Sequence, residues 1–376
     1  MPSIIPEPIA ALPWKVIFAL CGICLFGTAV LYSAAGGSMQ PWAQPHLVQF
    51  LVFLSLALGI RMISVDLIQR LAFAAFGACL LLLIFVEVLG QVGGGSQRWL
   101  SLGPLTLQPS ELMKLAIIMA LARYYDMLPA GVVAEWRSLW PPLCVMGLPA
   151  LLVLIQPDLD TALILCVGGA VVMFLAGTPT RVFAWAAAAA ALVAPLAYFF
   201  VLKEYQQTRL LSFLAPESDP LGAGYHVIQS KIAIGSGGLF GKGFLNGTQG
   251  RLSYLPEHHT DLVFATLFEE WGLVGGLALL AVYMWLFIWG YKTAVAAASR
   301  FGKLMAAGLT TTIFFYVAMN MLTATAITPV MGVPLPLVSH GGSAMMTIMI
   351  AFGLIMAVER EGARNRARPR TGFLLP

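Results

Sequence analysis

Long apolar runs dominate the pattern of the chain. Each run is about as long as the 20 residues that a helix needs to span the roughly 30 Å hydrocarbon core of a bilayer. The runs do not alternate between polar and apolar positions, and only helices or closed barrels satisfy their backbone groups in lipid, so we predict transmembrane helices. We expect about ten, at residues 14–34, 46–64, 70–90, 110–125, 139–156, 160–178, 183–202, 262–291, 303–325 and 341–358.

The composition supports a membrane protein. Of the 376 residues, 59% are hydrophobic and 10% are charged, whereas soluble domains carry about 25% charged residues. So few polar groups cannot cover a water-facing globule. We therefore predict an all-α, polytopic membrane protein with one membrane domain over residues 1–376, whose first run is a retained helix rather than a cleaved signal peptide.

The positions of Lys and Arg predict the orientation, because positive side chains resist translocation. If the N-terminus is cytoplasmic, most of these residues fall in cytoplasmic segments, including a basic tail at 360–376. The short outer links 35–45 and 326–340 contain neither Lys nor Arg. We expect both termini in the cytoplasm, and we attribute the net charge of +4 to topology and the tail rather than to nucleic-acid binding.

Residues 203–261 form the largest predicted loop, on the extracytoplasmic side between the seventh and eighth helices. A loop of this length is more than a connector, and its middle, residues 225–234, has the composition of a short interfacial helix. The glycine run at 235–243 is not a nucleotide-binding P-loop, because Ser236 and Gly243 occupy positions where that motif requires Gly and Ser or Thr.

The cysteines predict neither a disulfide framework nor a metal site. All five lie inside apolar runs, where packing is the simpler explanation. They are Cys21, Cys24, Cys79, Cys144 and Cys166.

Ionisable groups at membrane depth are costly, by about 2.5–3.5 kcal/mol each, so each needs a reason. Glu111 and Lys114 lie one turn apart on a predicted helix, either as an ion pair that fixes packing or as a wall of a polar cavity; the two are compatible. Asp158 and Asp160 mark an outer turn, where capping of the next helix competes with a role in a site.

A polar cluster stands where the large loop re-enters the membrane. Glu257, His258, His259 and Asp261 directly precede the apolar run at 262. A carboxylate at this boundary is partly desolvated, which raises its pKa toward that of a usable general base. Capping of the next helix is the alternative, and the spacing matches no zinc pattern.

Several loop motifs recur in order over nearly the whole chain and resemble the SEDS family, specifically its rod-shape branch, RodA. The resemblance to RodA rather than to the division paralogue FtsW comes mainly from Gly-Ala-Gly-Tyr-His at 222–226 and Gly-Lys-Gly at 241–243. The other motifs are Gln-Arg-Trp-Leu (97–100), Gln-Pro-Ser-Glu-Leu-Met-Lys-Leu (108–115), Gln-Pro-Asp-Leu (156–159), 216–226, 229–238, Pro-Glu-His-His-Thr-Asp (256–261) and Gly-Val-Pro-Leu-Pro-Leu-Val-Ser (332–339).

This resemblance implies a peptidoglycan glycosyltransferase of the bacterial cytoplasmic membrane that polymerises lipid II into a growing glycan strand during cell elongation, with Asp261 as the essential carboxylate. It also implies a class B penicillin-binding transpeptidase and other elongation-complex membrane proteins as partners. A divalent cation, Mg or Mn, or basic side chains would offset the leaving diphosphate. The expected substrate-binding or cavity residues are Arg98, Glu111, Lys114, Asp158, Arg209, Lys231, Glu257, His259 and Ser339.

The chain departs from the family pattern at Asp160, where Gly is usual, at Gln207, where Arg is common, at His340, where Tyr is common, and over 323–328. Local repacking or altered substrate handling would explain these differences. Two other classes of function remain open: a flippase or ion-coupled transporter that uses the buried charges, and a scaffold for other wall-building proteins.

Overall fold

Long helices occupy all ten predicted apolar runs. The computed structural model describes residues 12–89, 91–93, 96–102, 105–200, 202, 204–215, 223–251, 259–329 and 331–367. The ten helices are α2 (Trp14–Ala34), α3 (Ala43–Met62), α4 (Val65–Leu89), α5 (Pro109–Met127), α6 (Trp136–Ile155), α7 (Leu159–Ala176), α8 (Thr180–Phe200), α12 (Val263–Ala296), α13 (Arg300–Ala324) and α14 (Gly342–Ala367).

Eight of the described helices are long and apolar enough to cross a membrane. The other two long helices are α8, an apolar helix of 21 residues, and α5, which carries Glu111 and Lys114 as well as further charged residues. The predicted class, a polytopic all-α membrane protein, is confirmed.

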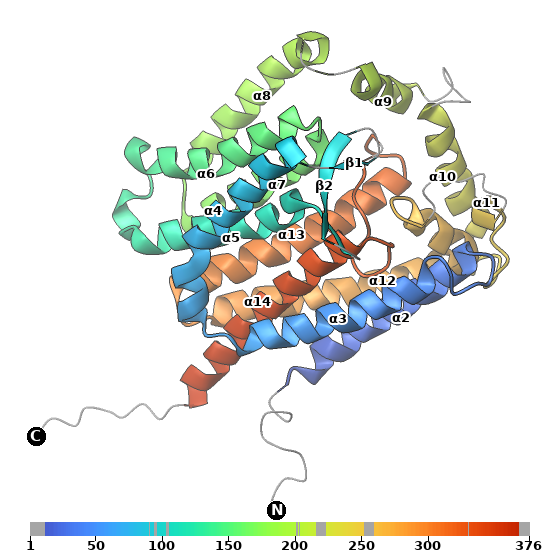
Figure 1. The fold of residues 1–376 in the computed structure, drawn as a ribbon, viewed down its shortest axis with the longest axis horizontal. Helices are drawn as coiled ribbons and strands as arrows, with labels where there is room; N and C mark the ends of the chain where they lie inside the picture. The colour runs from blue at the N-terminus through green and yellow to red at the C-terminus, as the bar shows by residue number, and fades with distance from the viewer. Residues whose placement is uncertain are drawn as a thin grey trace, which may run out of the picture.

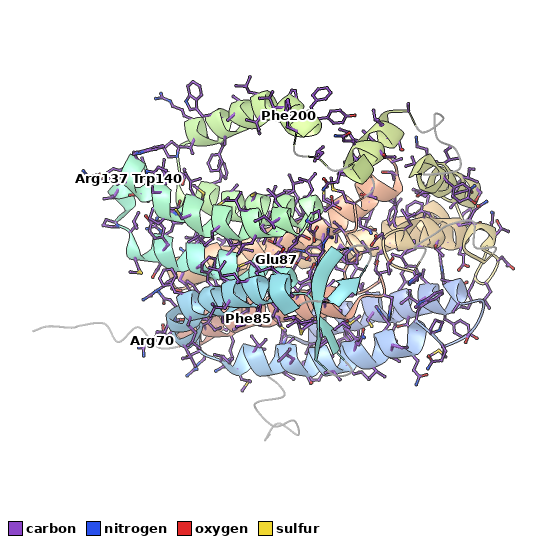
Figure 2. All side chains as sticks on the ribbon, turned by 45° about the horizontal axis from the view of Figure 1, so that its top comes forward. Arg70, Phe85, Glu87, Arg137, Trp140 and Phe200 are labelled. Atoms are coloured by element: carbon purple, nitrogen blue, oxygen red, sulfur yellow. The ribbon has the colours of Figure 1, made fainter. Side chains whose placement is uncertain are left out.

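The outer surface of the bundle is apolar, as expected for helices that face lipid. Figure 2 labels Phe85 on α4, Trp140 on α6 and Phe200 at the end of α8, and all three side chains are exposed. Buried charged side chains instead face other helices. This distribution is the reverse of a soluble protein's and fits a lipid environment.

The bundle packs around α5, α12, α13 and α14 (Figure 1). Helix α14 packs extensively against α3, α12 against α13, and α4 against α5. In Figure 1, α8 lies apart from the other helices at the edge of the molecule. The central helices therefore form the frame on which the loops are held.

Three short strands form a small antiparallel sheet that the sequence pattern did not predict. Its strands are β1 (Gln91–Gly93), β2 (Ser96–Leu102) and β3 (Leu105–Leu107), in the order β1-β2-β3. The sheet lies between α4 and α5, and β3 ends two residues before Pro109 begins α5. It thereby carries β2 to the N-terminal end of α5.

The described part of the predicted outer loop contains three helices, α9 (Glu204–Leu214), α10 (Ala223–Gly237) and α11 (Thr248–Arg251). Helix α10 contains the segment predicted to be a short helix and packs against α12. Gln207, one of the departures, donates to the carbonyls of Tyr198 and Leu202. It thus joins the end of α8 to α9.

The part of the glycine run that follows α10, residues 238–243, packs into a break in α12. The break is at Gly272, whose φ of 64° suits only glycine. The carbonyls of Glu269 and Glu270, which lose their helical partners there, accept hydrogen bonds from the amides of Lys242 and Gly243 at 2.9 and 3.0 Å. The glycines allow the backbone of this segment to approach the backbone of α12 closely. This packing role accounts for a glycine-rich run that is not a phosphate-binding loop.

Candidate active site

Asp261 lies in the turn directly before α12 and is fixed through its backbone. Asn320 of α13 is fully buried. Its side-chain amide donates to the carbonyl oxygens of Asp261 and Val333, both at 2.8 Å. Because Val333 belongs to the segment between α13 and α14, three parts of the chain are joined at Asp261.

A cavity of about 440 Å³ opens beside Asp261. Five of the residues singled out from the sequence line it: Arg98, Glu111, Lys114, Asp158 and Asp261. The lining also includes Asp160 and His340, two of the departures from the family pattern, and residues that the sequence did not single out, among them Trp99, Gln108, Thr161, Thr260, Tyr316 and Ser343.

Glu111, Lys114 and Tyr316 form a closed, buried triangle in the cavity wall. The Lys114 Nζ lies 2.6 Å from the Glu111 Oε1 and donates to the Tyr316 hydroxyl at 2.5 Å. That hydroxyl donates in turn to the Glu111 Oε2 at 2.5 Å. Each charged group therefore has a charged partner and a hydrogen-bond partner, as buried ions require.

Arg98 and Asp158 form a second pair in the wall. Arg98, on β2, lies 3.3 Å from the Asp158 carboxylate and also donates to the carbonyls of Gln156 and Pro157. Asp158 caps α7 by accepting from the Thr161 amide at 3.1 Å. The sequence left open whether Asp158 caps a helix or belongs to a site. In the structure it caps α7 and also lines the cavity.

Asp160 and Asp261 flank the same glycine. The Asp160 carboxylate accepts a hydrogen bond from the Gly332 amide at 3.2 Å. A Cβ added to Gly332 would lie 3.5 Å from the Asp261 Oδ2. The two carboxylates therefore approach one short stretch of backbone from two sides.

Two predicted site residues support the cavity from behind. Ser339 is buried; its hydroxyl donates to the Thr260 carbonyl at 2.5 Å and accepts from the Leu335 amide at 2.8 Å. The His259 ring stacks on Trp42 with ring centres 4.3 Å apart. Neither Ser339 nor His259 is among the described residues that line the cavity; both contact the segments that do, and a direct role in substrate binding stays a prediction.

Of the other three predicted residues, Lys231 has a described side chain. It is an exposed residue of α10 and is not among the described residues that line the cavity, so its part in substrate binding stays a prediction. Glu257 lies outside the described residues, and so does the side chain of Arg209.

Acidic groups outnumber basic groups in the cavity wall. Two basic side chains face four carboxylates, and both basic groups are already held by carboxylates. This wall offers an incoming anion no unpaired basic group among the described residues. The six are Arg98, Lys114, Glu111, Asp158, Asp160 and Asp261.

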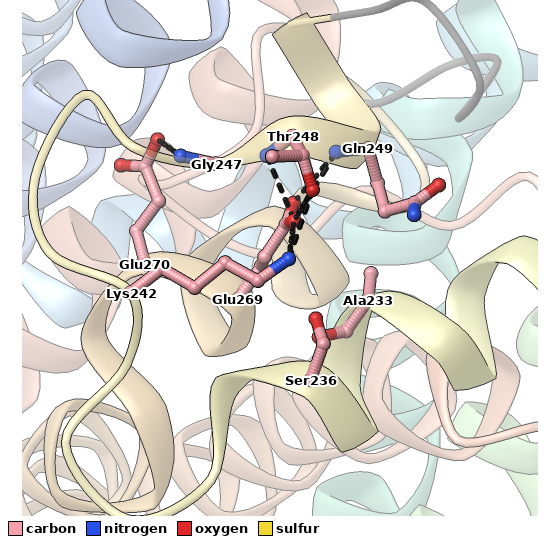
Figure 3. Close-up of polar contacts among 8 residues, drawn as sticks. All are labelled: Ala233, Ser236, Lys242, Gly247, Thr248, Gln249, Glu269 and Glu270. Atoms are coloured by element: carbon pink, nitrogen blue, oxygen red, sulfur yellow. Dashed lines mark hydrogen bonds and ion pairs between the residues drawn. The ribbon is translucent and has the colours of Figure 1, made fainter.

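A second buried carboxylate cluster ties the outer loop to α12 (Figure 3). Glu269 is fully buried. It accepts from the Lys242 Nζ at 2.7 Å, from both the amide and the hydroxyl of Thr248 at 2.8 Å, and from the Gln249 amide at 3.1 Å. The loop is therefore fixed to α12 about two turns beyond the end that follows Asp261.

The neighbouring carboxylate extends this attachment to α2. Glu270 accepts from the Gly247 amide at 3.3 Å (Figure 3) and from the Ser33 hydroxyl. The sequence analysis did not single out Glu269 and Glu270. The signal was available, because two carboxylates inside an otherwise apolar helix are costly at membrane depth and need partners.

Comparison with known proteins gives a consistent family. The FtsW/RodA/SpoVE family model, described as cell cycle protein, matches residues 11–364. The peptidoglycan glycosyltransferase MrdB of Escherichia coli K12 is 41% identical over 344 residues, which are 91% of this chain and 92% of MrdB. A probable peptidoglycan glycosyltransferase FtsW of Tolumonas auensis is 33% identical, covering 92% of this chain and 90% of that protein.

Solved structures agree in fold. A chain of a peptidoglycan synthase complex matches with a TM-score of 0.80 and 35% identity, covering 94% of this chain and 98% of that one. The rod shape determining protein RodA of Thermus thermophilus matches with a TM-score of 0.70 and 30% identity, covering 95% of this chain and 98% of that one.

Proposed function

Because the chain belongs to the FtsW/RodA/SpoVE family of cell cycle proteins, we propose that it is a peptidoglycan glycosyltransferase that polymerises lipid II during cell elongation. The observation that carries the proposal is the placement of Asp261 at a polar cavity inside an apolar bundle. Both substrates of such an enzyme carry polyprenyl tails, so a saccharide cavity inside a membrane bundle suits them. Relatives named as glycosyltransferases favour this function over a transporter or a scaffold, and the higher identity to MrdB favours elongation over division.

In the proposed mechanism, Asp261 accepts the proton of the acceptor sugar's 4-hydroxyl as that oxygen attacks the anomeric carbon of the donor chain. Undecaprenyl diphosphate leaves from the opposite face, so an α-linked donor gives a β-1,4 bond by inversion. A diphosphate leaves readily once its charge is offset, so a second carboxylic acid is not required, unlike in glycoside hydrolysis. The Asn320 amide supports this role by holding the Asp261 backbone.

The charge of the wall supports a divalent cation, Mg or Mn, as cofactor. Arg98 and Lys114 are each paired with a carboxylate, so they offset little of a diphosphate's charge. Within the described residues, no cluster of three His, Cys, Asp or Glu side chains is placed to hold a metal. Mg²⁺ often binds through one or two carboxylates plus substrate phosphates, and Asp160 and Asp261 fit that pattern. Such an ion would neutralise the leaving diphosphate.

Chelation tests the cation directly. We expect EDTA to abolish polymerisation by the purified protein, and Mg²⁺ or Mn²⁺ to restore it. Full activity in EDTA would contradict this part of the proposal. Monovalent salt at equal ionic strength is the control, because it screens charge without binding between carboxylate and phosphate.

The partner and the orientation are also proposals. Similarity to a chain of a peptidoglycan synthase complex that coordinates polymerization and crosslinking supports a class B penicillin-binding transpeptidase as partner. The distribution of Lys and Arg supports cytoplasmic termini and an extracytoplasmic active site. The partner is tested by polymerisation assays with and without the co-purified transpeptidase, since equal rates would count against a required pairing.

Polymerisation itself is tested with purified protein, its partner, labelled lipid II and a divalent salt. We expect glycan strands from the unmodified protein and none from Asp261→Asn or Asp261→Ala. Equal polymer from both variants would contradict the mechanism. Lipid II transfer across vesicles without polymer would favour the transporter.

A further inference from the structure

The segment between α13 and α14 holds His340 rigidly at the cavity. The His340 amide donates to the His259 carbonyl at 2.9 Å, and the preceding Ser339 amide donates to the Leu335 carbonyl at 2.9 Å. The rings of His259 and His340 lie 6.5 Å apart between centres. The backbone of His340 is therefore fixed, and its imidazole lines the cavity together with Thr260 and Asp261.

The two nitrogens of this ring have different surroundings. Nδ1 is enclosed by protein and has no hydrogen-bond partner among the described residues. Nε2 is not enclosed in this way, and no described residue bonds to it, so it is the nitrogen available to the cavity. A bound molecule is the natural source of its missing partner.

The enclosed Nδ1 determines where the proton of His340 lies. A proton on Nδ1 would bury a donor without an acceptor, which is less tolerable than an unpaired lone pair. The proton is therefore assigned to Nε2. Burial also lowers the pKa of His340 below its usual 6.5, so the ring is neutral near pH 7. Its titratable or charged neighbours are His46 on α3, His259 and Asp261.

We propose that His340 is a substrate-binding residue that donates its neutral Nε2–H to an uncharged oxygen of the saccharide, either a hydroxyl or an N-acetyl carbonyl. The proposal rests on the proposed glycosyltransferase function and adds a specificity contact. An uncharged oxygen suits a neutral donor, because the cation proposed at Asp160 and Asp261 of the same cavity would take the diphosphate and leave His340 to the sugar. A neutral donor also binds the sugar without a change of protonation during the reaction.

Three substitutions of similar size separate the two nitrogens. The side-chain amide of His340→Gln reaches the place of Nε2 and keeps a donor there. His340→Asn places its amide near Nδ1 instead, and His340→Phe keeps the ring without any donor. All three keep the backbone amide that bonds to His259.

The experiment measures kcat/KM for lipid II polymerisation at pH 7, alongside the unmodified protein and Asp261→Asn. We expect His340→Gln to stay within about threefold of the unmodified protein, while His340→Phe and His340→Asn lose about tenfold, the usual effect of one neutral hydrogen bond. The ratio of kcat/KM for His340→Gln to that of the unmodified protein should stay constant from pH 7.5 to 8.5, since a neutral donor does not titrate there.

Three results would overturn the inference. The first is a kcat/KM for His340→Phe equal to that of the unmodified protein. The second is a kcat/KM for His340→Gln as low as that of His340→Phe. The third is a ratio of His340→Gln to the unmodified protein that changes with pH, as a proton-transfer group requires. In each case polymer from the unmodified protein, lost in Asp261→Asn, leaves the glycosyltransferase function standing. Absence of polymer from the unmodified protein would overturn that function and this inference together.

Discussion

At the scale of single residues, the cavity is built from charges that are already paired. Glu111 and Lys114 are each about 5% exposed or less and share the Tyr316 hydroxyl. Removing one member of a buried pair leaves an uncompensated charge, whereas removing both is far less costly. Single and double variants of Glu111 and Lys114 can therefore separate the effect of the pair on stability from its effect on activity.

Lys114→Met should destabilise the protein by about 3–5 kcal/mol, because Glu111 would lose its cation in a buried position. The double variant Glu111→Gln/Lys114→Met should recover much of this loss. Thermal unfolding in detergent measures both effects. A double variant no more stable than Lys114→Met would contradict the pairing, and full polymerisation by the double variant would assign the pair to packing alone.

Sequence reasoning found the charged residues of the site but not its uncharged ones. Glu111 and Asp158 are conspicuous because charges are costly at membrane depth. Tyr316 follows two phenylalanines in an apolar helix, and Asn320 lies one turn later, so neither signals its role. Lys231 was predicted from the resemblance and lies exposed on α10, since a charge in a loop can lie on a helix surface as easily as in a cavity.

At the scale of elements, the outer loop and α12 are one structural unit. Apolar length predicted the helices well, since the lipid requirement acts on every residue of a span. The sheet at 91–107 was not predicted, because β1 and β3 have only three residues each. The break at Gly272 was not predicted either, because the segment that packs into it, around Gly241, lies some thirty residues earlier in the chain.

Gly241→Ala should detach the loop from α12. Gly241 has φ +77°, and an added Cβ would overlap the Glu270 carbonyl, so we expect a loss of about 1–3 kcal/mol from strain at this position and faster proteolysis of the loop. Gly235→Ala is the matched control, since a Cβ there meets nothing within 4 Å. Equal proteolysis of the two variants would show that the close approach does not hold the loop.

At the scale of the whole molecule, the helices form a frame that holds Asp261 at a polar cavity. Helix α13 supplies Asn320, α5 supplies Lys114, and the segment before α14 supplies His340. In the proposed orientation, which rests on the positive-inside distribution, this cavity lies on the extracytoplasmic side, where lipid II would be polymerised. The orientation and the function therefore depend on each other.

Cysteine labelling in intact cells tests the orientation. Phe240, 78% exposed after α10, and Arg364, exposed near the end of α14, are expected on opposite sides. A membrane-impermeant maleimide should label Phe240→Cys but not Arg364→Cys until the cells are opened. The unmodified protein, with its native cysteines, is the control. Labelling of Arg364→Cys alone in intact cells would reverse the orientation and remove the basis for extracytoplasmic synthesis.

The rate of lipid II polymerisation by Asp261→Asn tests the central claim most directly. Asn keeps the size of the side chain but cannot accept the acceptor's proton, and loss of a general base lowers rates by about 10²–10⁴-fold. Asp66→Asn is the matched control, because Asp66 lies on α4, exposed and outside the cavity. The account predicts a loss of at least about a hundredfold for Asp261→Asn and an unchanged rate for Asp66→Asn; an unchanged rate for Asp261→Asn would contradict it.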